Sequence, residues 1–345
     1  MASSAKKSTP PLLRLAHPMA FSAFLSQMGA PVERYMRGAG LPVLCDDPDA
    51  FVPLAKVWSF FDTAARHEDP MLGWLVGAHV GDHKLNAGLL RKLETAPTLL
   101  QALLGLARMV SAEATDIDLG IHERRDDVLF YMRYPGMREA PGYMISQAYQ
   151  IELILDLIRH FLGRHWIPRE IGIESPSVPP AAKAHFPGTQ FLTRQRSGFI
   201  AVPRSCLHRT ALLGGVNVGG AVGLVPAEKF DYLATLRAVL KAYLHEGYPS
   251  ARFAAELMNT SMRTLARTLS TYGLTYGALI DATRFEAAKE QLQNPDMRIG
   301  DVAHSVGFDD QGDFTRMFRR IGGLSPREFR NSVPSSVEGA QSLGG

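Results

Sequence analysis

The chain has 345 residues, of which 46% are hydrophobic and 21% charged, and its formal net charge is only +3. This composition is typical of a soluble globular protein of about two domains and excludes a mostly disordered chain. The charge is too even to coat nucleic acid by bulk attraction, so a nucleic-acid surface must come from local arrangement. The two cysteines, Cys45 and Cys206, exclude a disulfide framework and a four-cysteine zinc site.

The N-terminus and the hydropathy of the chain predict a cytoplasmic protein. Lys6 and Lys7 could begin a signal peptide, but Pro10, Pro11 and Arg14 interrupt the apolar segment that should follow. No run approaches the ~18 uncharged apolar residues of a membrane-spanning helix. We therefore expect no membrane segment.

Residues 1–16 are rich in Ser, Lys and Pro and predict a flexible arm, and residues 17–210 predict a regulatory or ligand-binding domain of mixed structure. Helices are predicted at residues 20–28, 32–36, 57–66, 98–110, 143–162 and 181–185. Strands are predicted at residues 117–122, 128–134, 171–173, 190–193 and 199–202. Short turns join strand pairs, so we expect an α+β domain with a small antiparallel or mixed sheet.

A glycine-rich segment follows, and it predicts a linker over residues 211–228. Five glycines and Pro226 lie between residues 212 and 227, with no charged residue among them. Glycine at this density makes regular structure costly, although a buried glycine-rich turn within one large domain remains an alternative. Beyond it, apolar residues recur only at helical spacing, which predicts an all-α domain over residues 229–331 and a flexible tail over residues 332–345.

A helix-turn-helix motif is predicted at residues 250–270. Ser250 suits the N-cap of a first helix, whose close contact is made by the small side chain of Ala255. Asn259 tolerates the left-handed backbone that the turn requires, and Ser261 caps a second helix with Leu265 on its core face. In such a motif the second helix enters the major groove of DNA.

A second copy of this motif is predicted at residues 299–320. Ala255-x3-Asn259 matches Ala303-x3-Gly307, and the stretch at 265–269 matches the stretch at 314–318, each with Arg as its third residue. Asp309 or Asp310 can cap the second helix of this copy. One such motif is a weak signal, but two matched copies strongly favour DNA binding.

The segment between the two copies predicts one long linker helix. Residues 276–293 contain neither Gly nor Pro after Gly277, so they form a rod of ~17 residues, or ~26 Å. A rod of this length can hold two recognition helices about one DNA turn (~34 Å) apart. A monomer could then occupy two successive major grooves of double-stranded DNA.

These motifs resemble the AraC-type family of bacterial transcriptional regulators. The resemblance spans Leu236 to Arg330 and is most specific from Ile299 onward, in Ile-x2-Val-Ala-x3-Gly-Phe, Phe-x-Arg-x-Phe and Gly-Leu-Ser-Pro-x-x-Phe-Arg. The first region is similar to the arabinose-binding-like, non-cupin ligand domain of one AraC-type subgroup. Three stretches carry that similarity, namely Gly-Leu-Pro at 40–42, Asp-Pro-Met-Leu-Gly at 69–73 and Ala-Pro-Thr-Leu at 96–99.

The resemblance implies a sequence-specific transcriptional regulator, an activator, that responds to a small-molecule effector through its N-terminal domain. It also implies RNA polymerase as a partner and homodimers formed through the N-terminal domain, without a cofactor or a metal. The residues identify neither the effector nor its pocket.

The resemblance also places nine side chains at DNA-facing positions, namely Ser261, Arg263, Thr264, Arg267, Gln311, Thr315, Arg316, Arg319 and Arg320. Arg pairs with guanine and Gln with adenine, whereas Ser261, Arg319 and Arg320 are better placed for phosphates. A structural ion pair remains an alternative role for Arg267, and for Arg316 with Asp301 or Asp313. Residues 236–330 hold 13 basic and 11 acidic side chains, a net charge of +2, so binding must rest on the positions of the charges.

An enzyme carrying a DNA-targeting domain is the alternative function. Cys206 with His208 could act in DNA-repair alkyl transfer, but the sequence lacks the Pro before and the His directly after the cysteine that this chemistry's motif has. The chain also has no Walker loop, paired catalytic carboxylates or serine-hydrolase elbow.

Overall fold

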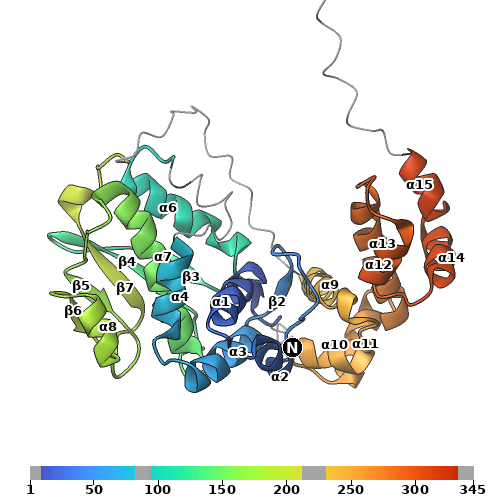
Figure 1. Cartoon of the computed structure of the whole chain (residues 1–345), viewed down its shortest axis with the longest axis horizontal. Helices are drawn as coiled ribbons and strands as arrows, with labels where there is room; N and C mark the ends of the chain where they lie inside the picture. The colour runs from blue at the N-terminus through green and yellow to red at the C-terminus, as the bar shows by residue number, and fades with distance from the viewer. Residues whose placement is uncertain (1–8, 82–92, 94, 212–230, 333–345) are drawn as a thin grey trace, which may run out of the picture. The chain divides into compact units, whose positions relative to one another are not determined.

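The structure is a computed structural model that describes residues 9–81, 93, 95–211 and 231–332 (Figure 1). The chain divides into two compact units. One comprises Pro11–Leu41 and Asp47–Phe230, and the other comprises Asp231–Gly345 with Met1–Pro10 and Pro42–Asp46. The predicted linker lies almost wholly outside the described residues, as does the predicted tail beyond Ser332.

The first unit combines helices with a small main sheet, as predicted, and with a second, two-stranded sheet that was not predicted. Its described helices are α1 (Ala16–Gln27), α2 (Val32–Ala39), α3 (Leu54–His67), α4 (Leu72–Gly81), α6 (Leu99–Met109), α7 (Tyr143–Leu162) and α8 (Pro180–His185), with short 3-10 turns η1 (Val110–Ala112) and η2 (Arg204–Cys206). Its strands are β1 (Leu12–Arg14), β2 (Phe51–Pro53), β3 (Asp118–Glu123), β4 (Asp127–Arg133), β5 (Glu170–Gly172), β6 (Gln190–Leu192) and β7 (Gly198–Pro203).

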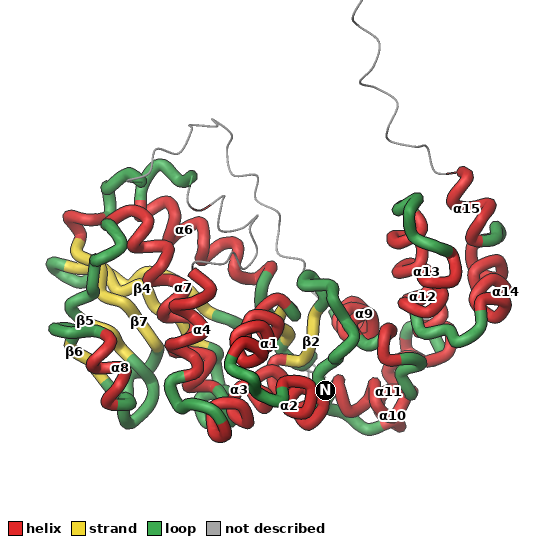
Figure 2. Tube along the Cα trace, viewed as in Figure 1, coloured by secondary structure: helices red, strands yellow, loops and turns green. Residues whose placement is uncertain are grey.

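The main sheet, whose strands are drawn in yellow in Figure 2, is mixed. Its strand order is β3-β4-β7-β5-β6, and every neighbouring pair is antiparallel except β5–β6. A separate antiparallel pair joins β1 to β2, with Leu13 opposite Val52. The α+β prediction is therefore confirmed for this unit.

Helix α7 packs against the main sheet and against α4, and it carries much of the core. Two glycines on α4 allow a close approach of the two helices. A Cβ on Gly73 would lie 2.2 Å from the backbone O of Ile145, and one on Gly77 would lie 2.6 Å from the Cβ of Glu152. Any larger residue would push the helices apart, which gives a physical reason for Gly73 at the end of the Asp-Pro-Met-Leu-Gly stretch.

The prediction of a flexible arm over residues 1–16 is wrong for its second half. Leu12–Arg14 form β1, α1 begins at Ala16, and Leu12 and Leu15 are fully buried. A Ser- and Pro-rich composition favours a flexible chain. Here hydrogen bonding to β2 and burial of the two leucines offset the entropy that the backbone loses when it becomes ordered.

The second unit is all-α over residues 231–332, as predicted. Its elements are α9 (Tyr232–Ala242), η3 (Leu244–Glu246), α10 (Ala251–Leu257), α11 (Met262–Thr271), α12 (Tyr276–Leu292), α13 (Ile299–Ser305), α14 (Gln311–Gly322) and α15 (Pro326–Ser332). Leu236, Leu265, Ile280, Phe314 and Phe318 share one buried cluster. None of the helices that the structure describes in either unit is long and apolar enough to cross a bilayer.

Candidate DNA interface and effector cavity

Helices α10 and α11 form the first helix-turn-helix. Ser250 caps α10 by accepting a hydrogen bond from the Phe253 N–H at 3.1 Å, and Ser261 caps α11 by accepting from the Thr264 N–H at 3.1 Å. Asn259 adopts φ of +48°, the left-handed backbone predicted for the turn. The Thr260 N–H then donates to the Ala255 carbonyl at 2.9 Å and closes the end of α10.

Helices α13 and α14 repeat the same geometry. Gly307 has φ of +81°, and the Phe308 N–H donates to the Ala303 carbonyl at 2.9 Å. This bond spans five residues, as the Thr260–Ala255 bond does, and Asp310 caps α14 by accepting from the Asp313 N–H at 2.9 Å. The predicted match between Ala255-x3-Asn259 and Ala303-x3-Gly307 therefore holds down to the hydrogen bond that ends each first helix.

Helix α12 joins the two motifs as one helix of 17 residues, and Arg284 fixes it to the second turn. The guanidinium donates from Nη2 to the Gly307 carbonyl at 2.5 Å. It also lies 4.2 Å from the ring centre of Phe308 and 4.6 Å from that of Tyr248. Burial lowers the pKa of Arg284. Arginine's very high starting pKa keeps the side chain charged at neutral pH.

On α11 the predicted DNA-facing side chains are accessible. Ser261, Arg263 and Arg267 are exposed, and Thr264 is partly exposed. Within the described residues, the side chains of Arg263 and Arg267 make neither an ion pair nor a hydrogen bond, so the structure gives no sign of the alternative ion-pair role for Arg267.

On α14 the arginines are exposed but paired. Arg316 pairs with Asp313, which was one of its two predicted alternative partners. Arg319 Nη2 lies 3.2 Å from Glu328, and Arg320 Nη2 lies 2.6 Å from Asp281 on α12. Sequence reasoning missed both of these pairs.

These pairs are solvent-exposed, so each adds little to the stability of the fold and can yield to a phosphate. The Ser325 hydroxyl and backbone N–H, followed by Arg319, lower the pKa of Glu328 to about 2. The carboxylate therefore stays ionised at neutral pH and is the partner of Arg319 when no DNA is bound. The remaining predicted side chains on α14 are Gln311, which is exposed, and Thr315, whose hydroxyl donates to the Gln311 carbonyl at 2.8 Å.

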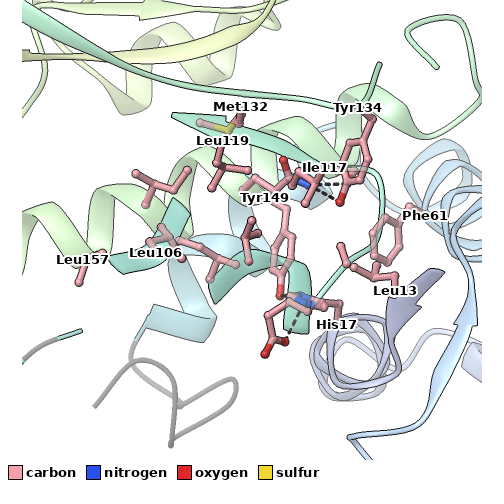
Figure 3. A pocket seen from close by; sticks show the side chains of 17 residues that line it. Leu13, His17, Phe61, Leu106, Ile117, Leu119, Met132, Tyr134, Tyr149 and Leu157 are labelled. Atoms are coloured by element: carbon pink, nitrogen blue, oxygen red, sulfur yellow. Dashed lines mark hydrogen bonds and ion pairs between the residues drawn. The ribbon is translucent and has the colours of Figure 1, made fainter. Parts of the chain in front are cut away.

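The first unit contains a cavity of about 110 Å³ between α7, the strands β3 and β4, and the helices α1 and α6 (Figure 3). Most of its lining is apolar, as in Leu106, Leu119, Met132 and Leu157. The lining residues come from positions 13 to 157, so no local sequence pattern marks the cavity.

A few polar side chains reach this cavity. His17 Nδ1 lies 3.1 Å from the Tyr149 hydroxyl, and His17 Nε2 lies 3.5 Å from Glu113 Oε2. Gln150 Nε2 donates to the Tyr134 hydroxyl at 3.1 Å. Burial raises the pKa of Tyr149 and of Tyr134, so both phenols stay protonated.

A second, polar hollow of about 400 Å³ is lined by other residues of α7, among them Glu152, Asp156 and Arg159. Its fully buried carboxylate, Glu152, lies 3.1 Å from His185 Nε2 and 3.5 Å from Arg159 Nη1. The close contact with Glu152 raises the pKa of His185, while partial burial and Arg159 lower it less.

This contact predicts a fall in stability as the pH rises. An unfolded histidine titrates near 6.5, and the raised folded pKa means that the native state holds the proton more tightly. The stabilisation by imidazolium is complete below about pH 6.5 and is lost as the pH rises through the raised value. Between pH 6 and pH 8 we expect the Tm of the first unit to fall less in His185→Gln than in the wild type.

Thermal melts at both pH values test this expectation. His122→Gln is the matched control, because His122 is exposed on β3 and makes no ion pair within the described chain. An equal fall in the wild type and in His185→Gln would rule out His185 as the titrating group.

The residues of the alternative enzyme do not form a site. Cys206 ends the short turn η2 and packs partly buried against the core. Within the described residues no hydrogen bond joins it to His208, which is exposed. Within the described part of the chain, His208 therefore does not contact the thiol as an activating base would.

Two family models match the chain. The N-terminal arabinose-binding domain of AraC transcription regulators matches residues 29–210, and a helix-turn-helix domain matches residues 254–332. These two matches coincide with the cavity-bearing unit and with the paired motifs.

Curated relatives are similar over shorter stretches. The transcriptional activator NphR of Rhodococcus sp. is 31% identical over 121 residues, which is 35% of this chain and 35% of the relative. The regulator VqsM of Pseudomonas aeruginosa is 34% identical over 138 residues, 38% of this chain and 42% of the relative. The activator RhaS of Enterobacter sp. is 34% identical over 85 residues, 24% of this chain and 31% of the relative. The match thus spans less than half the length of each of these relatives.

The arabinose-binding-domain model alone covers more than half of the 345 residues, and a helix-turn-helix model covers the second predicted motif and all but the first four residues of the first. The chain therefore belongs to the AraC family of transcription regulators.

Proposed function

We propose that the protein is a sequence-specific DNA-binding transcriptional activator whose N-terminal domain senses a small molecule. The observation that carries the proposal is the pair of equivalent helix-turn-helix turns joined by one 17-residue helix. We assign the DNA-binding domain to residues 229–331, the regulatory domain to residues 17–210, and the connection between them to residues 211–228.

The two recognition helices take different parts in this proposal. Arg263, Thr264 and Arg267 on α11 read bases, because both guanidiniums are exposed and unpaired within the described residues. On α14, Gln311, Thr315 and Arg316 face the second groove. Ser261, Arg319 and Arg320 hold phosphates. The second helix must release Arg316 from Asp313 before that arginine can read a base.

Footprinting on a selected binding site tests the proposal. We expect each monomer to protect two segments about one helical turn apart on the same face of the duplex, because α12 holds the motifs in fixed relation. The site is expected to be asymmetric or directly repeated, since the two motifs differ in sequence.

Substitutions on each motif assign the two segments. Arg267→Ala should weaken protection of one segment and Gln311→Ala that of the other, and Arg252→Ala, on α10, is the surface control. A single protected segment per monomer would contradict simultaneous binding by both motifs. No affinity for any duplex above that for random DNA would contradict the function itself.

We also propose RNA polymerase and a second copy of the chain as partners. Both proposals rest on the family to which the chain belongs. Transcription in a reconstituted system, with and without the N-terminal domain's effector, would show whether bound protein activates or represses.

A further inference from the structure

The size and lining of the cavity in the first unit limit the kind of ligand that it can bind. We infer that it binds a small neutral hydrophobic molecule with a single hydroxyl group, about the size of one six-membered ring, and not a sugar or an anion. This inference rests on the proposed effector response and gives its ligand a chemical class.

The size of the cavity limits the ligand. Its volume is about 110 Å³. An apolar cavity of about 150 Å³ accepts benzene, so a single ring or a short branched chain is the scale that fits here. Leu106, Leu119, Met132 and Leu157 supply walls without hydrogen-bonding groups. A sugar in this space would bury several hydroxyls without partners, which is costly.

One polar group in the wall of the cavity lacks a hydrogen-bond partner. His17 Nε2 is buried, and within the described residues it makes no hydrogen bond. The distance from Nε2 to Glu113 Oε2, 3.5 Å, is too long for a well-formed hydrogen bond. The other polar end is occupied, since Gln150 Nε2 already donates to Tyr134 and to Ser146 Oγ. In Figure 3, His17 and Tyr134 lie toward one end and Leu106 and Leu157 toward the other.

The neighbours of His17 suit a ligand hydroxyl. The Tyr149 hydroxyl lies 3.1 Å from His17 Nδ1, and in the tautomer in which this hydroxyl donates to Nδ1 the ring proton is on Nε2. A ligand hydroxyl can then accept from Nε2–H and donate to the Glu113 carboxylate. Glu113 would repel an anionic ligand in this dry setting, although Arg14 lies 3.8 Å from its other oxygen. A hydrocarbon fits the apolar walls but leaves His17 Nε2 without a hydrogen-bond partner.

A thermal-shift panel on the full chain tests the inference. The probes are benzyl alcohol and cyclohexanol, with toluene, benzoate and L-arabinose as the hydrocarbon, anionic and sugar comparisons. At about ten times their Kd the two alcohols should raise the Tm by about 3 °C or more. Toluene should bind several-fold more weakly, and benzoate and arabinose should give no shift.

Two substitutions locate the binding. Leu106→Trp on α6 fills the cavity and should abolish the alcohol shift, while Leu104→Trp, two residues away and exposed outside the cavity, should leave it unchanged. Leu119→Trp fills the cavity from β3, so a fold defect in one variant does not remove the test. His17→Leu should make toluene and the alcohols bind equally.

The outcomes separate this inference from the proposed function. A shift with arabinose or benzoate but not with the alcohols overturns the ligand class, as does an alcohol shift that survives both cavity-filling changes. No shift with any probe overturns it as well. In each of these cases the footprint on DNA still decides the proposed DNA binding. Alcohol binding that leaves DNA affinity unchanged would keep the cavity assignment and contradict only its role as an effector site.

Discussion

Gly307→Ala is expected to destabilise the DNA-binding domain by about 2–5 kcal/mol, the largest effect of any single methyl group we predict. The residue has φ of +81°, which costs a non-glycine residue about 1–2 kcal/mol. A Cβ there would also lie 2.7 Å from the Gly247 carbonyl, 2.8 Å from the Leu244 carbonyl and 2.9 Å from Arg284 Nη2. Backbone oxygens cannot rotate away, so the turn must shift.

Gly323→Ala separates the two causes. Gly323 has nearly the same φ, +77°, but a Cβ there meets nothing within 4 Å. Its substitution should therefore cost only the backbone strain, about 1–2 kcal/mol. Melting of the full chain with and without DNA identifies the transition of the DNA-binding domain, because DNA stabilises the domain that binds it. Equal losses for the two variants would show that close packing around Gly307 contributes nothing.

Elements with a strong periodic pattern could be predicted from the sequence. Helix α7 occupies residues 143–162, as its apolar spacing predicts, and the five strands of the main sheet fall within about two residues of their predicted bounds. The repeat between the two motifs was also visible, because its turn residues and apolar faces are local. These features are set by neighbouring residues, and so they can be read along the chain.

Helix α4 and the β1–β2 pair were not predicted, for different reasons. Gly73 and Gly77 lower the helix propensity of α4, and its apolar residues surround the axis instead of forming one stripe. Its helical state depends on packing against α7, which is distant in sequence. Strands β1 and β2 have three residues each, and their paired residues lie 37 to 41 positions apart in the sequence.

The residues of the candidate sites also differ in whether the sequence could predict them. The exposed arginines of α11 and the cap at Ser261 follow from the motif. The pairing of Arg320 with Asp281 joins two helices across 39 residues, and the cavity gathers side chains from positions 13 to 157. Contacts between residues so far apart in the sequence form only in the tertiary structure, and no local pattern in a single sequence predicts them.

Arg267→Ala is expected to reduce affinity for the specific site by about 1–3 kcal/mol, or roughly 5- to 150-fold, and to relax the preference at one base pair. Arg267 is exposed on α11 and has no partner among the described residues, while Leu265 and Leu269 hold the opposite face of the helix in the core. Removing the side chain should leave the fold intact.

Arg320→Ala is the matched comparison, because it removes the same group from the other recognition helix. Arg320 pairs with Asp281 at 2.6 Å and is placed for a phosphate. Its loss should weaken specific and random duplexes alike and lower the salt slope of binding by about one. Affinities for both duplexes at two salt concentrations, with circular dichroism to verify folding, distinguish the two roles. Equal, sequence-independent losses would remove Arg267 from the base-reading residues, and an unfolded Arg267→Ala would indicate a structural role instead.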